Sequence, residues 1–368
     1  MDLMKIADIG IYRFRLGLNR PLALKNDILK LREGFVVRLS DESGNCGWGE
    51  TSPLSGFSRE TIEQAGRELA LLPSAITKGA IPPNLELLSG GFEDWLGGFN
   101  LSASVRFGLE SAVLNMQAMS KQLGLHRLLD AKAAAKVAVN ALLSGPREQI
   151  EAKARALLGK GYRAFKLKVG RLSLDEDIEI VAGVRNIICQ DALLRLDANR
   201  TWDLDDALKF MQRAVQFNIN YIEEPLQSFD QLKILLKDSS APLPVALDES
   251  LLEMSPAELP LLPALKAIVI KPTLLGFEQA LRFARAAQDK GITAVISSAF
   301  ESSLGLATLA SMAAVIDGGR TPAGLDTLDW LKDDLLEPPM RVQAGKIVLA
   351  DDASLMKNIK MELLEKFA

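Results

Sequence analysis

The stretch AFKLKV, residues 164–169, is the most informative segment of this 368-residue chain. It predicts a short buried strand that ends in two lysines, Lys166 and Lys168, two positions apart. Side chains two apart on a strand point to the same side. Similar short apolar segments follow along the chain, each separated from the next by a helical stretch, and this alternation predicts a parallel sheet.

The number of these units indicates the fold. The expected strands are Val137–Leu143, Ala164–Val169, Leu193–Ala198, Asn220–Glu224, Val245–Asp248, Ala267–Ile270 and Thr293–Ser297, with an eighth near Ala323–Leu328. Seven or eight such units in about 190 residues favour a closed, TIM-like (β/α)7β barrel of the α/β class. A doubly wound open sheet is the alternative. The sequence contains neither G-x-G-x-x-G nor a Walker motif to support nucleotide binding on such a sheet.

The first 130 residues follow a different pattern. The expected elements there are strands at Lys5–Phe14, Gly34–Leu39 and Cys46–Glu50, a helix beginning near Ser58, a long connection at 73–100 and an amphipathic helix at Ser104–Leu123. We therefore expect an α+β capping domain at 1–130 and a catalytic barrel at 131–330. The segment 331–368 is expected to complete the barrel and pack toward the cap.

Charged residues recur near the carboxyl ends of the expected strands, and these ends meet on one face of a barrel, where active sites of this fold lie. Asp197, Glu223 and Asp248 come from three adjacent strands. Three neighbouring carboxylates repel one another, and burying them is costly without a cation. An all-oxygen site suits a hard divalent ion, so we expect Mg²⁺, with Mn²⁺ as the alternative.

The lysines are the candidate acid–base groups. Lys166 and Lys168 each disfavour the charge of the other, so we expect the pKa of one of them to fall toward neutral pH. Lys271 comes from the opposite side of the ring. Two lysines that face each other across a metal ion suit proton abstraction next to a carboxylate, with the ion holding the developing enediolate.

Composition excludes several classes of function. The formal charge is 43 − 47 = −4, which argues against strong binding to nucleic acid or to an anionic membrane. The longest strongly apolar uncharged stretch, 302–316, is shorter than the roughly 20 residues that cross a bilayer. The N-terminus lacks the pattern of a signal peptide, so we expect a cytoplasmic protein. The expected partner is a small-molecule carboxylate, and the sequence leaves the oligomeric state open.

The scarcity of histidine and cysteine narrows the chemistry further. His126 is the single histidine, so a zinc site built on two or three histidines is excluded. It follows a helix-ending glycine, and we expect a structural role. Cys46 and Cys189 allow at most one disulfide and are expected to be ordinary thiols.

The order Lys-x-Lys, Asp, Glu, Asp, Lys on successive strands resembles the enolase superfamily in its muconate-lactonising subgroup, over most of the chain. Within that subgroup the chain is most similar to the o-succinylbenzoate synthase family. The segments that carry this resemblance are GWGETSPLSGFS at 47–58, RLDANR at 195–200, VIKPTL at 269–274, AVISS at 294–298, ESSLGL at 301–306 and GLDTLD at 324–329.

The resemblance implies a Mg²⁺-dependent syn dehydration in menaquinone biosynthesis. By that resemblance Asp197, Glu223 and Asp248 bind the metal, and Glu223 is preferred to Glu224 as the first glutamate of Glu-Glu-Pro. Lys168 is the base, Lys271 stabilises the enediolate from the other face, and Lys166 tunes Lys168. Arg195, Ser297 and Gly324 match positions around the substrate, and the loop at Leu54–Ser58 closes over the site.

Two alternatives remain at this stage. An N-acylamino acid racemase or a cycloisomerase of the same superfamily needs the same lysines and metal. Dipeptide epimerases of the subgroup carry Asp-x-Asp on the last strand, whereas this chain has Asp326-Thr327-Leu328-Asp329, which disfavours that activity. A barrel retained as a binding or structural protein would show a broken metal trio or a missing lysine, and neither is seen here.

Overall fold

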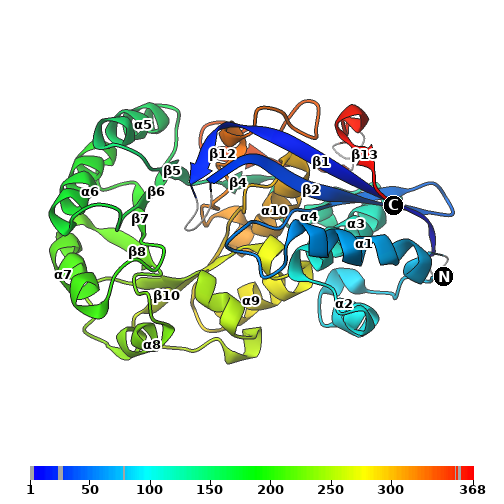
Figure 1. Cartoon of the computed structure of the whole chain (residues 1–368). Coiled ribbons are helices and arrows are strands. Elements are labelled where there is room, and N and C mark those ends of the chain that lie inside the picture. Colours follow the sequence, from blue (N-terminus) through cyan, green and yellow to red (C-terminus); the bar gives the residue numbers. More distant parts are fainter. Residues whose placement is uncertain (1–3, 24–27, 78, 353, 355–357) are drawn as a thin grey trace.

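The computed structural model describes residues 4–23, 28–77, 79–352, 354 and 358–368. The N-terminal part is built on a four-stranded antiparallel sheet of order β13-β1-β2-β3 (Figure 1). Its strands are β1 (Ile6–Ala23), β2 (Ile28–Asp41), β3 (Cys46–Thr51) and β13 (Glu365–Lys366). The expected hairpin is present at β2 and β3, which are joined by the turn at 42–45.

Helices cover this sheet, and two glycines allow the close approach of one of them. The helices are α1 (Ile62–Ile76), α2 (Gly91–Leu96), α3 (Ala103–Ser120) and α4 (Leu125–Leu129). A Cβ atom on Gly47 would lie 2.0 Å from the carbonyl oxygen of Ala112, and one on Gly49 would lie 1.9 Å from that of Gly108. Only glycine on β3 therefore lets α3 pack backbone to backbone against the strand.

The predicted barrel is confirmed. Seven parallel strands form one sheet in chain order, and it curls with helices along its outer side (Figure 1). The strands are β5 (Ala141–Leu143), β6 (Ala164–Lys168), β7 (Leu193–Asp197), β8 (Ile219–Glu223), β9 (Val245–Leu247), β10 (Leu265–Ile270) and β11 (Thr293–Ile296). The helices are α5 (Arg147–Gly159), α6 (Leu174–Ile188), α7 (Leu204–Ala214), α8 (Phe229–Lys237), α9 (Phe277–Asp289) and α10 (Ser303–Val315).

Alternation along the strands separates the two faces of the barrel wall. In β7, for example, Leu194 and Leu196 join the large apolar core, whereas Arg195 and Asp197 lie on the other face of the strand. A smaller cluster of buried side chains fills the barrel interior below the charged strand ends. Its members are Tyr221, Ala246, Ala267, Val269 and Val295.

Closure of the barrel differs from the sequence prediction. The eighth strand expected at Ala323–Leu328 is reduced to parallel bridges of Ala323 with Val139 and of Gly324 with Ser297. The first predicted strand, Val137–Leu143, is divided into β4 (Lys136–Ala138) and β5, and β4 pairs with β12 (Lys346–Val348). Two residues suffice to span the seam because they bond both neighbours: Ala323 N donates to Ala138 O, and Gly324 N donates to Ile296 O.

The long connection predicted at 73–100 is also partly wrong, since α1 continues to Ile76 and α2 lies within it. The remaining elements are short 3₁₀ helices at Leu85–Leu87, Gly97–Phe99, Val215–Phe217, Glu249–Glu253, Pro256–Glu258, Pro272–Leu274, Asp317–Gly319, Leu328–Trp330 and Met361–Leu363. Among the described residues, no helix is long and apolar enough to cross a membrane.

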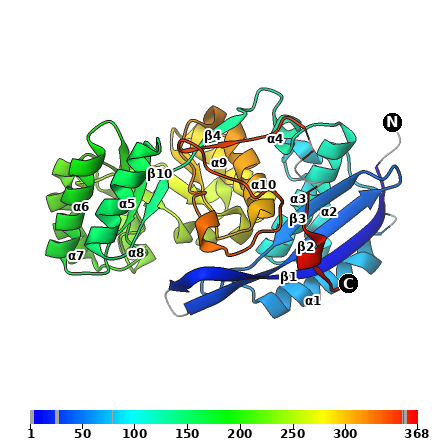
Figure 2. The same ribbon diagram turned by 90° about the horizontal axis from the view of Figure 1, so that it is seen from above.

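The C-terminal segment returns to the N-terminal sheet. Tyr12 pairs with Lys366 and Arg13 with Glu365, so the last strand, β13, lies beside β1 in the N-terminal sheet (Figure 2). This contact joins the two ends of the chain. The domain limits near residues 130 and 330 stay a prediction.

A buried carboxylate pair joins cap and barrel at the N-terminus of α9. Glu110 on α3 accepts a hydrogen bond of 2.9 Å from the backbone N–H of Glu278 on α9. The carboxylate of Glu278 in turn accepts bonds from the backbone N–H groups of Gly90 and Glu93 in the cap. Burial raises the pKa of Glu110 from 4.5 to about 7, although Arg106 opposes the shift.

We predict that Glu110→Gln becomes progressively more stable than the wild type between pH 4.5 and 7. In that window the unfolded chain has released the Glu110 proton while the folded protein retains it. The contribution of Glu110 to stability therefore falls as the pH rises through it, by up to about 3 kcal/mol. Glutamine has no proton to lose. Urea unfolding of both proteins from pH 4.5 to 8 measures the difference, and a difference independent of pH would contradict the prediction.

Candidate active site

The strand ends bring the predicted charged residues side by side. Lys168 pairs in register with Asp197, and Asp197 pairs with Glu223 on the next strand. Asp248 follows β9, and Lys271 follows β10. Asp197 and Glu223 are almost completely buried, at 1% and 0% exposure. The parallel register therefore assembles one acidic row from residues about 50 positions apart in sequence.

Lysine ammonium groups contact this row directly. Lys166 Nζ lies 2.8 Å from Asp197 Oδ2 and 2.8 Å from both carboxylate oxygens of Glu223. Lys168 Nζ donates to Asp197 Oδ2 at 2.7 Å. On the other side of the row, Lys271 Nζ donates to Asp248 Oδ2. Lys168 and Lys271 thus hold different carboxylates, at opposite ends of the row.

The pKa values of the carboxyl groups in the row are shifted in different directions. Burial would raise the pKa of Asp197, but Lys166 and Lys168 outweigh it and hold that pKa below its usual value. Lys271 likewise lowers the pKa of Asp248 against the effect of burial. Burial raises the pKa of Glu223 well above its usual value, and the charge of Asp197 adds to the rise. Contact with lysines therefore outweighs burial at Asp197 and Asp248 but not at Glu223.

The lowering of pKa expected for one lysine of the Lys-x-Lys pair does not occur at Lys166. Burial alone would lower the pKa of Lys166, but Asp197 and Glu223 raise it well above its usual value. Contact with two carboxylates at 2.8 Å outweighs repulsion by a neighbouring ammonium group, and the sequence does not reveal that contact.

The carboxylate oxygens of the row are the type of ligand atom that a hard divalent ion prefers. Their positions must be considered separately from their type. In the described part of the chain, no group of three or more His, Cys, Asp or Glu side chains is arranged to hold a metal ion. Lys166 and Lys271 instead occupy carboxylate oxygens of the row. Glu249 Oε2 is buried without a hydrogen-bond partner among the described residues, and burial raises the pKa of Glu249 to about 7. Buried, undercompensated oxygens of this kind favour a cation.

The two adjacent glutamates have different surroundings. Glu223 faces Lys166, whereas the carboxylate of Glu224 accepts hydrogen bonds from the backbone N–H groups of Asp248 and Ser250 at 2.9 and 2.8 Å. Arg200 Nε also donates to Glu224, at 3.0 Å. Glu224 therefore braces the backbone that carries Asp248, which is consistent with the preference for Glu223 as the ligand.

Comparisons with known proteins identify the family. The model of the enolase C-terminal domain-like family matches residues 149–353, and that of the MenC N-terminal domain matches residues 6–116. An o-succinylbenzoate synthase of Edwardsiella ictaluri is 34% identical over 89% of this chain and 92% of its own length. The chain belongs to the o-succinylbenzoate synthase family.

One further relative in sequence and two solved structures are also similar to this chain. The chloroplastic protein PHYLLO of Arabidopsis thaliana is 34% identical over 91% of the chain, which spans only 22% of PHYLLO. A muconate lactonizing enzyme of Pseudomonas fluorescens superposes with a TM-score of 0.85 at 20% identity, over 98% of both chains. A dipeptide epimerase of Enterococcus faecalis, solved with Mg and a dipeptide, gives 0.82 at 23% identity, over 96% of this chain and 99% of its own. The fold of o-succinylbenzoate synthases is thus shared with other members of the enolase superfamily.

The predicted substrate contacts of this o-succinylbenzoate synthase family member lie in two places. Ser297 and Gly324 meet at the barrel seam, where Ser297 Oγ lies 3.5 Å from the carbonyl oxygen of Gly324. Arg195 pairs in register with Lys166, one layer below Asp197. Its guanidinium donates to Asn140 Oδ1 at 3.0 Å and to Pro322 O at 2.6 Å, so these bonds already engage it within the protein.

Three further residues belong to the site, and of these the sequence pointed only to Phe57, through the loop at Leu54–Ser58. Asn199 accepts a hydrogen bond from Lys168 Nζ and donates to Glu249 at 3.3 Å, so it links the expected base to the end of the acidic row. The ring of Phe57, on the loop from the cap, lies 6.0 Å from Lys271 Nζ. Glu249 directly follows the predicted ligand Asp248, and Asn199 lies two residues after the predicted ligand Asp197, which is the signal that could have identified them.

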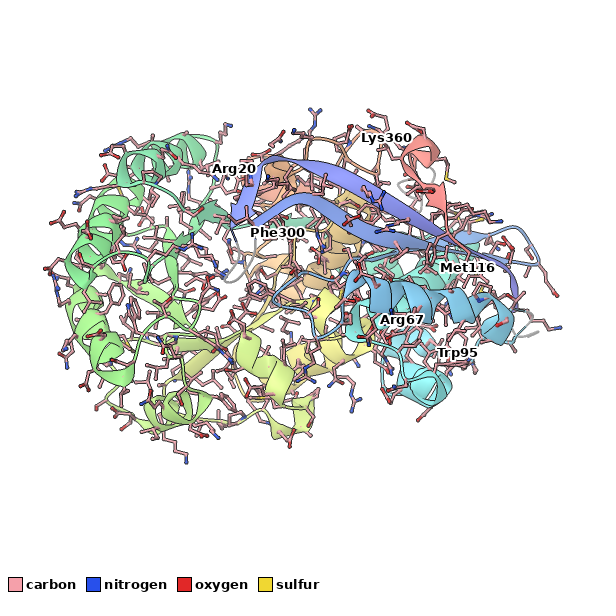
Figure 3. All side chains as sticks on the ribbon, in the orientation of Figure 1. Arg20, Arg67, Trp95, Met116, Phe300 and Lys360 are labelled. Atoms are coloured by element: carbon pink, nitrogen blue, oxygen red, sulfur yellow. The ribbon has the colours of Figure 1, made fainter. Side chains whose placement is uncertain are left out.

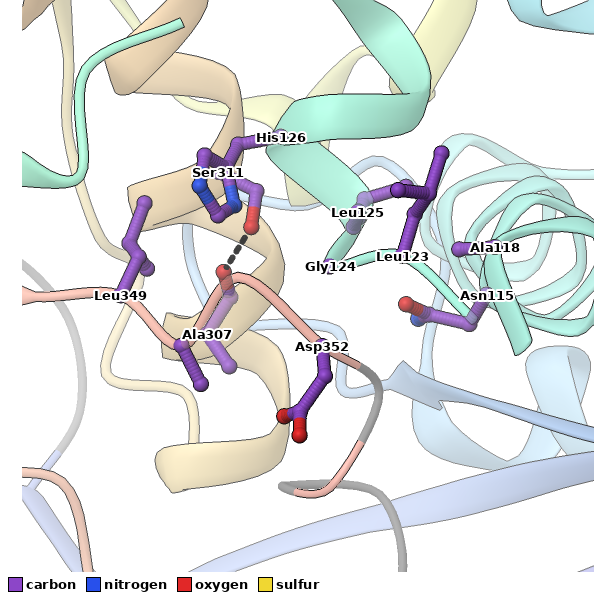
Figure 4. Close-up of a pocket in the computed structure, with 11 residues that line it drawn as sticks. Asn115, Ala118, Leu123, Gly124, Leu125, His126, Ala307, Ser311, Leu349 and Asp352 are labelled. Atoms are coloured by element: carbon purple, nitrogen blue, oxygen red, sulfur yellow. Dashed lines mark hydrogen bonds between the residues drawn. The ribbon is translucent and has the colours of Figure 1, made fainter. Parts of the chain in front are cut away.

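The single histidine lies in the interior of the protein. His126 is 1% exposed and lies beside Ser311 in a small cavity of about 30 Å³ between α3, α4, α10 and the segment near Leu349 (Figure 4). Burial lowers its pKa, although Asp351 lies 3.4 Å from its Nε2. Cys46 and Cys189 are free thiols, as expected. This cavity is lined by residues other than those of the acidic row.

We predict that Gly324→Ala destabilises the protein by about 1 to 3 kcal/mol, because its Cβ would lie 2.6 Å from Ser297 Oγ. Ser297→Ala removes that oxygen but leaves Ser297 Cβ at 3.2 Å, so the double variant should recover part of the loss. Urea unfolding of the wild type, both single variants and the double variant measures this coupling. Strictly additive effects would show that the clash is absent.

Proposed function

We propose that this protein converts 2-succinyl-6-hydroxy-2,4-cyclohexadiene-1-carboxylate to o-succinylbenzoate by Mg²⁺-dependent syn elimination of water, in menaquinone biosynthesis. The observation that carries the proposal is the placement of Lys168 and Lys271 on different carboxylates of one buried acidic row. Family membership supports the choice of substrate. The proposal also includes a cytoplasmic location and a small-molecule carboxylate as the substrate, with the oligomeric state left open.

Lys168 acts as the base in this proposal. Its neutral amine takes the proton from the ring carbon next to the substrate carboxylate, and the electron pair of the broken C–H bond enters an enediolate. The resulting ammonium then gives the same proton to the hydroxyl group on the same face, the C–O bond breaks, and water leaves as the ring becomes aromatic. Asn199 orients Lys168 by accepting a hydrogen bond from its Nζ.

The other charged groups stabilise negative charge. Lys271 remains an ammonium on the opposite face of the ring, and Asp248 raises its pKa against the effect of burial, which suits that role. Asp197, Glu223 and Asp248 would hold Mg²⁺ once the lysines release their oxygens. An ion held by these residues would supply charge stabilisation to the substrate carboxylate.

The groups around the row orient the substrate and exclude water. We assign Lys166 to tune Lys168, and Ser297 and Gly324 to contact the substrate at the barrel seam. Arg195 supports Lys166 from the layer below, with its guanidinium on Asn140 and Pro322. The loop that bears Phe57 covers Lys271 from the cap and reduces the access of water.

An N-acylamino acid racemase of the same superfamily is the second candidate, because it needs the same lysines and metal. An epimerase that binds an amino group through Asp326 is disfavoured by a specific contact. Asp326 Oδ1 accepts a hydrogen bond of 3.1 Å from the hydroxyl group of Tyr162. Its carboxylate is thus engaged at the barrel wall.

We predict that Lys168→Ala lowers the rate of substrate loss, followed by ultraviolet absorbance with Mg²⁺, by at least about 10³-fold, since it removes the proposed base. Lys209→Ala, on an exposed residue of α7, serves as the matched control and should keep wild-type activity. Turnover that survives in Lys168→Ala would overturn the mechanism. A wild-type preference for an N-acylamino acid over the cyclohexadiene would favour the racemase instead.

We also predict that Mg²⁺ stabilises the wild type and not Glu223→Gln. An ion that binds only the folded state adds about 2.7 kcal/mol at a concentration of 100 times its Kd. Thermal melting with Mg²⁺ and with chelator measures this shift. Glu253→Gln, which alters a more exposed carboxylate near Arg200, is the control and should respond like the wild type. An equal Mg²⁺ shift in Glu223→Gln would exclude that residue as a ligand.

A further inference from the structure

Arg32 joins two loops that belong to different parts of the molecule. We call residues 52–58 the lid and residues 297–301 the β11 loop. Arg32 lies on β2 in the cap and is 3% exposed. It contacts both loops through its guanidinium group. The β11 loop begins with Ser297, one of the residues proposed to contact the substrate.

All five N–H donors of Arg32 meet backbone carbonyl groups. Two of these acceptors are in the lid, two are in the β11 loop and one is the neighbouring residue on β2. The acceptors are Ser52 O, Pro53 O at 2.6 Å, Ala299 O at 3.2 Å, Phe300 O at 3.1 Å and Glu33 O at 3.4 Å. The planar fork of arginine can hold all of these positions at once, whereas lysine has only three donors on a single atom.

Glu301 ties the β11 loop to the neighbouring strand end. Its carboxylate is 1% exposed and accepts hydrogen bonds from Thr273 Oγ1, from Ser298 Oγ and from the backbone N–H of Ala299, at 2.5, 2.6 and 2.8 Å. Thr273 lies two residues after Lys271 in sequence. The loop that Arg32 holds is therefore also connected to the strand end that carries the second lysine.

Glu50 connects the start of the lid to the barrel in the same way. It is buried and accepts bonds from Ser52 Oγ at 2.7 Å and from Ser302 Oγ at 2.5 Å. The backbone N–H of Gly305, in the first turn of α10, donates to it at 3.1 Å. The lid thus starts from a backbone that is bonded on one side to Arg32 and on the other to Glu50.

The β11 loop holds an unfavourable backbone conformation at this junction. Phe300 has a φ of 64°, in the left-handed region that a bulky side chain rarely adopts. It lies beside the β1–β2 hairpin, where the cap meets the barrel (Figure 3). Its carbonyl group accepts from Arg32, and its N–H donates to Ser298 Oγ at 2.9 Å. Such a conformation persists only where surrounding bonds define it.

We propose that Arg32 is a positioning residue that makes the seating of the lid and the placement of the β11 loop one cooperative event. Through the lid it sets Phe57 over Lys271, and through the β11 loop it sets Ser297. Arg59 fastens the other end of the lid by donating to Leu252 O, on the turn that follows Asp248. The consequence for catalysis rests on the proposed function, whereas the coupling of the two loops does not.

Amide hydrogen exchange in the free protein tests the coupling without substrate. In Arg32→Met we expect exchange at Phe57 and Ser58 and at Ala299 and Phe300, whose N–H groups are hydrogen-bonded in the two loops, to rise together, by at least about tenfold. Arg32→Lys should show a smaller rise in both loops. Glu278→Gln is the matched control, since Glu278 also bridges cap and barrel from a buried position but touches neither loop. It should leave exchange in both loops unchanged.

The outcomes distinguish coupling between the lid and the β11 loop from a general attachment of the cap to the barrel. A rise confined to one loop, or an equal rise in Glu278→Gln, would overturn the proposal. If Arg32→Met does not fold, Arg32→Lys carries the same comparison. In turnover assays Arg32→Met should lose at least about tenfold in kcat/KM, with Arg32→Lys intermediate and Glu278→Gln near the wild type. If the wild type does not turn over the cyclohexadiene substrate, the proposed function is refuted. The hydrogen-exchange result would still decide whether Arg32 couples the lid to the β11 loop.

Discussion

Repulsion among carboxylates at the ends of adjacent parallel strands is the constraint on which the site depends. Asp197 and Glu223 are direct register partners and both are buried, so their charges cannot be screened by water. Lysines from the neighbouring strand ends offset this repulsion, yet the pKa of Glu223 remains raised by burial and by Asp197. Burial makes the charged form of these carboxyl groups costly, and a further cation would offset that cost, while the lysines that contact the row are also the groups suited to move a proton.

The cap contributes to this site through buried polar groups as well as apolar packing. Gly47 and Gly49 let α3 approach the sheet, and Glu110 with Glu278 joins α3 to the barrel on one side. Arg32 and Glu50 join the cap to the loops of the barrel on the other side. The Arg32 junction includes the loop that follows β11, so interactions that attach the cap also define the shape of the site.

The fold and the charged set were predictable because both depend on periodic patterns. Parallel strands repeat at regular intervals, and each interval ends with a polar residue at the same face. The barrel seam was not predictable in the same way, since Ala323 and Gly324 close it with only two bridging residues. The raised pKa of Lys166 depends on distances to Asp197 and Glu223, which the order of residues does not contain. Asn199 was overlooked because a polar residue after a strand is ordinary until its partner is known.

The sequence by itself determined the class of fold, the family and the supply of lysines and carboxylates at the strand ends. It could do so because strand spacing and residue type are local properties that survive in a linear pattern. Only the tertiary structure decided which of Glu223 and Glu224 faces the lysines, and that Arg32 reaches loops about 20 and 270 residues away. These outcomes depend on where side chains meet across the interior, and contacts between distant segments are set by packing of the whole chain.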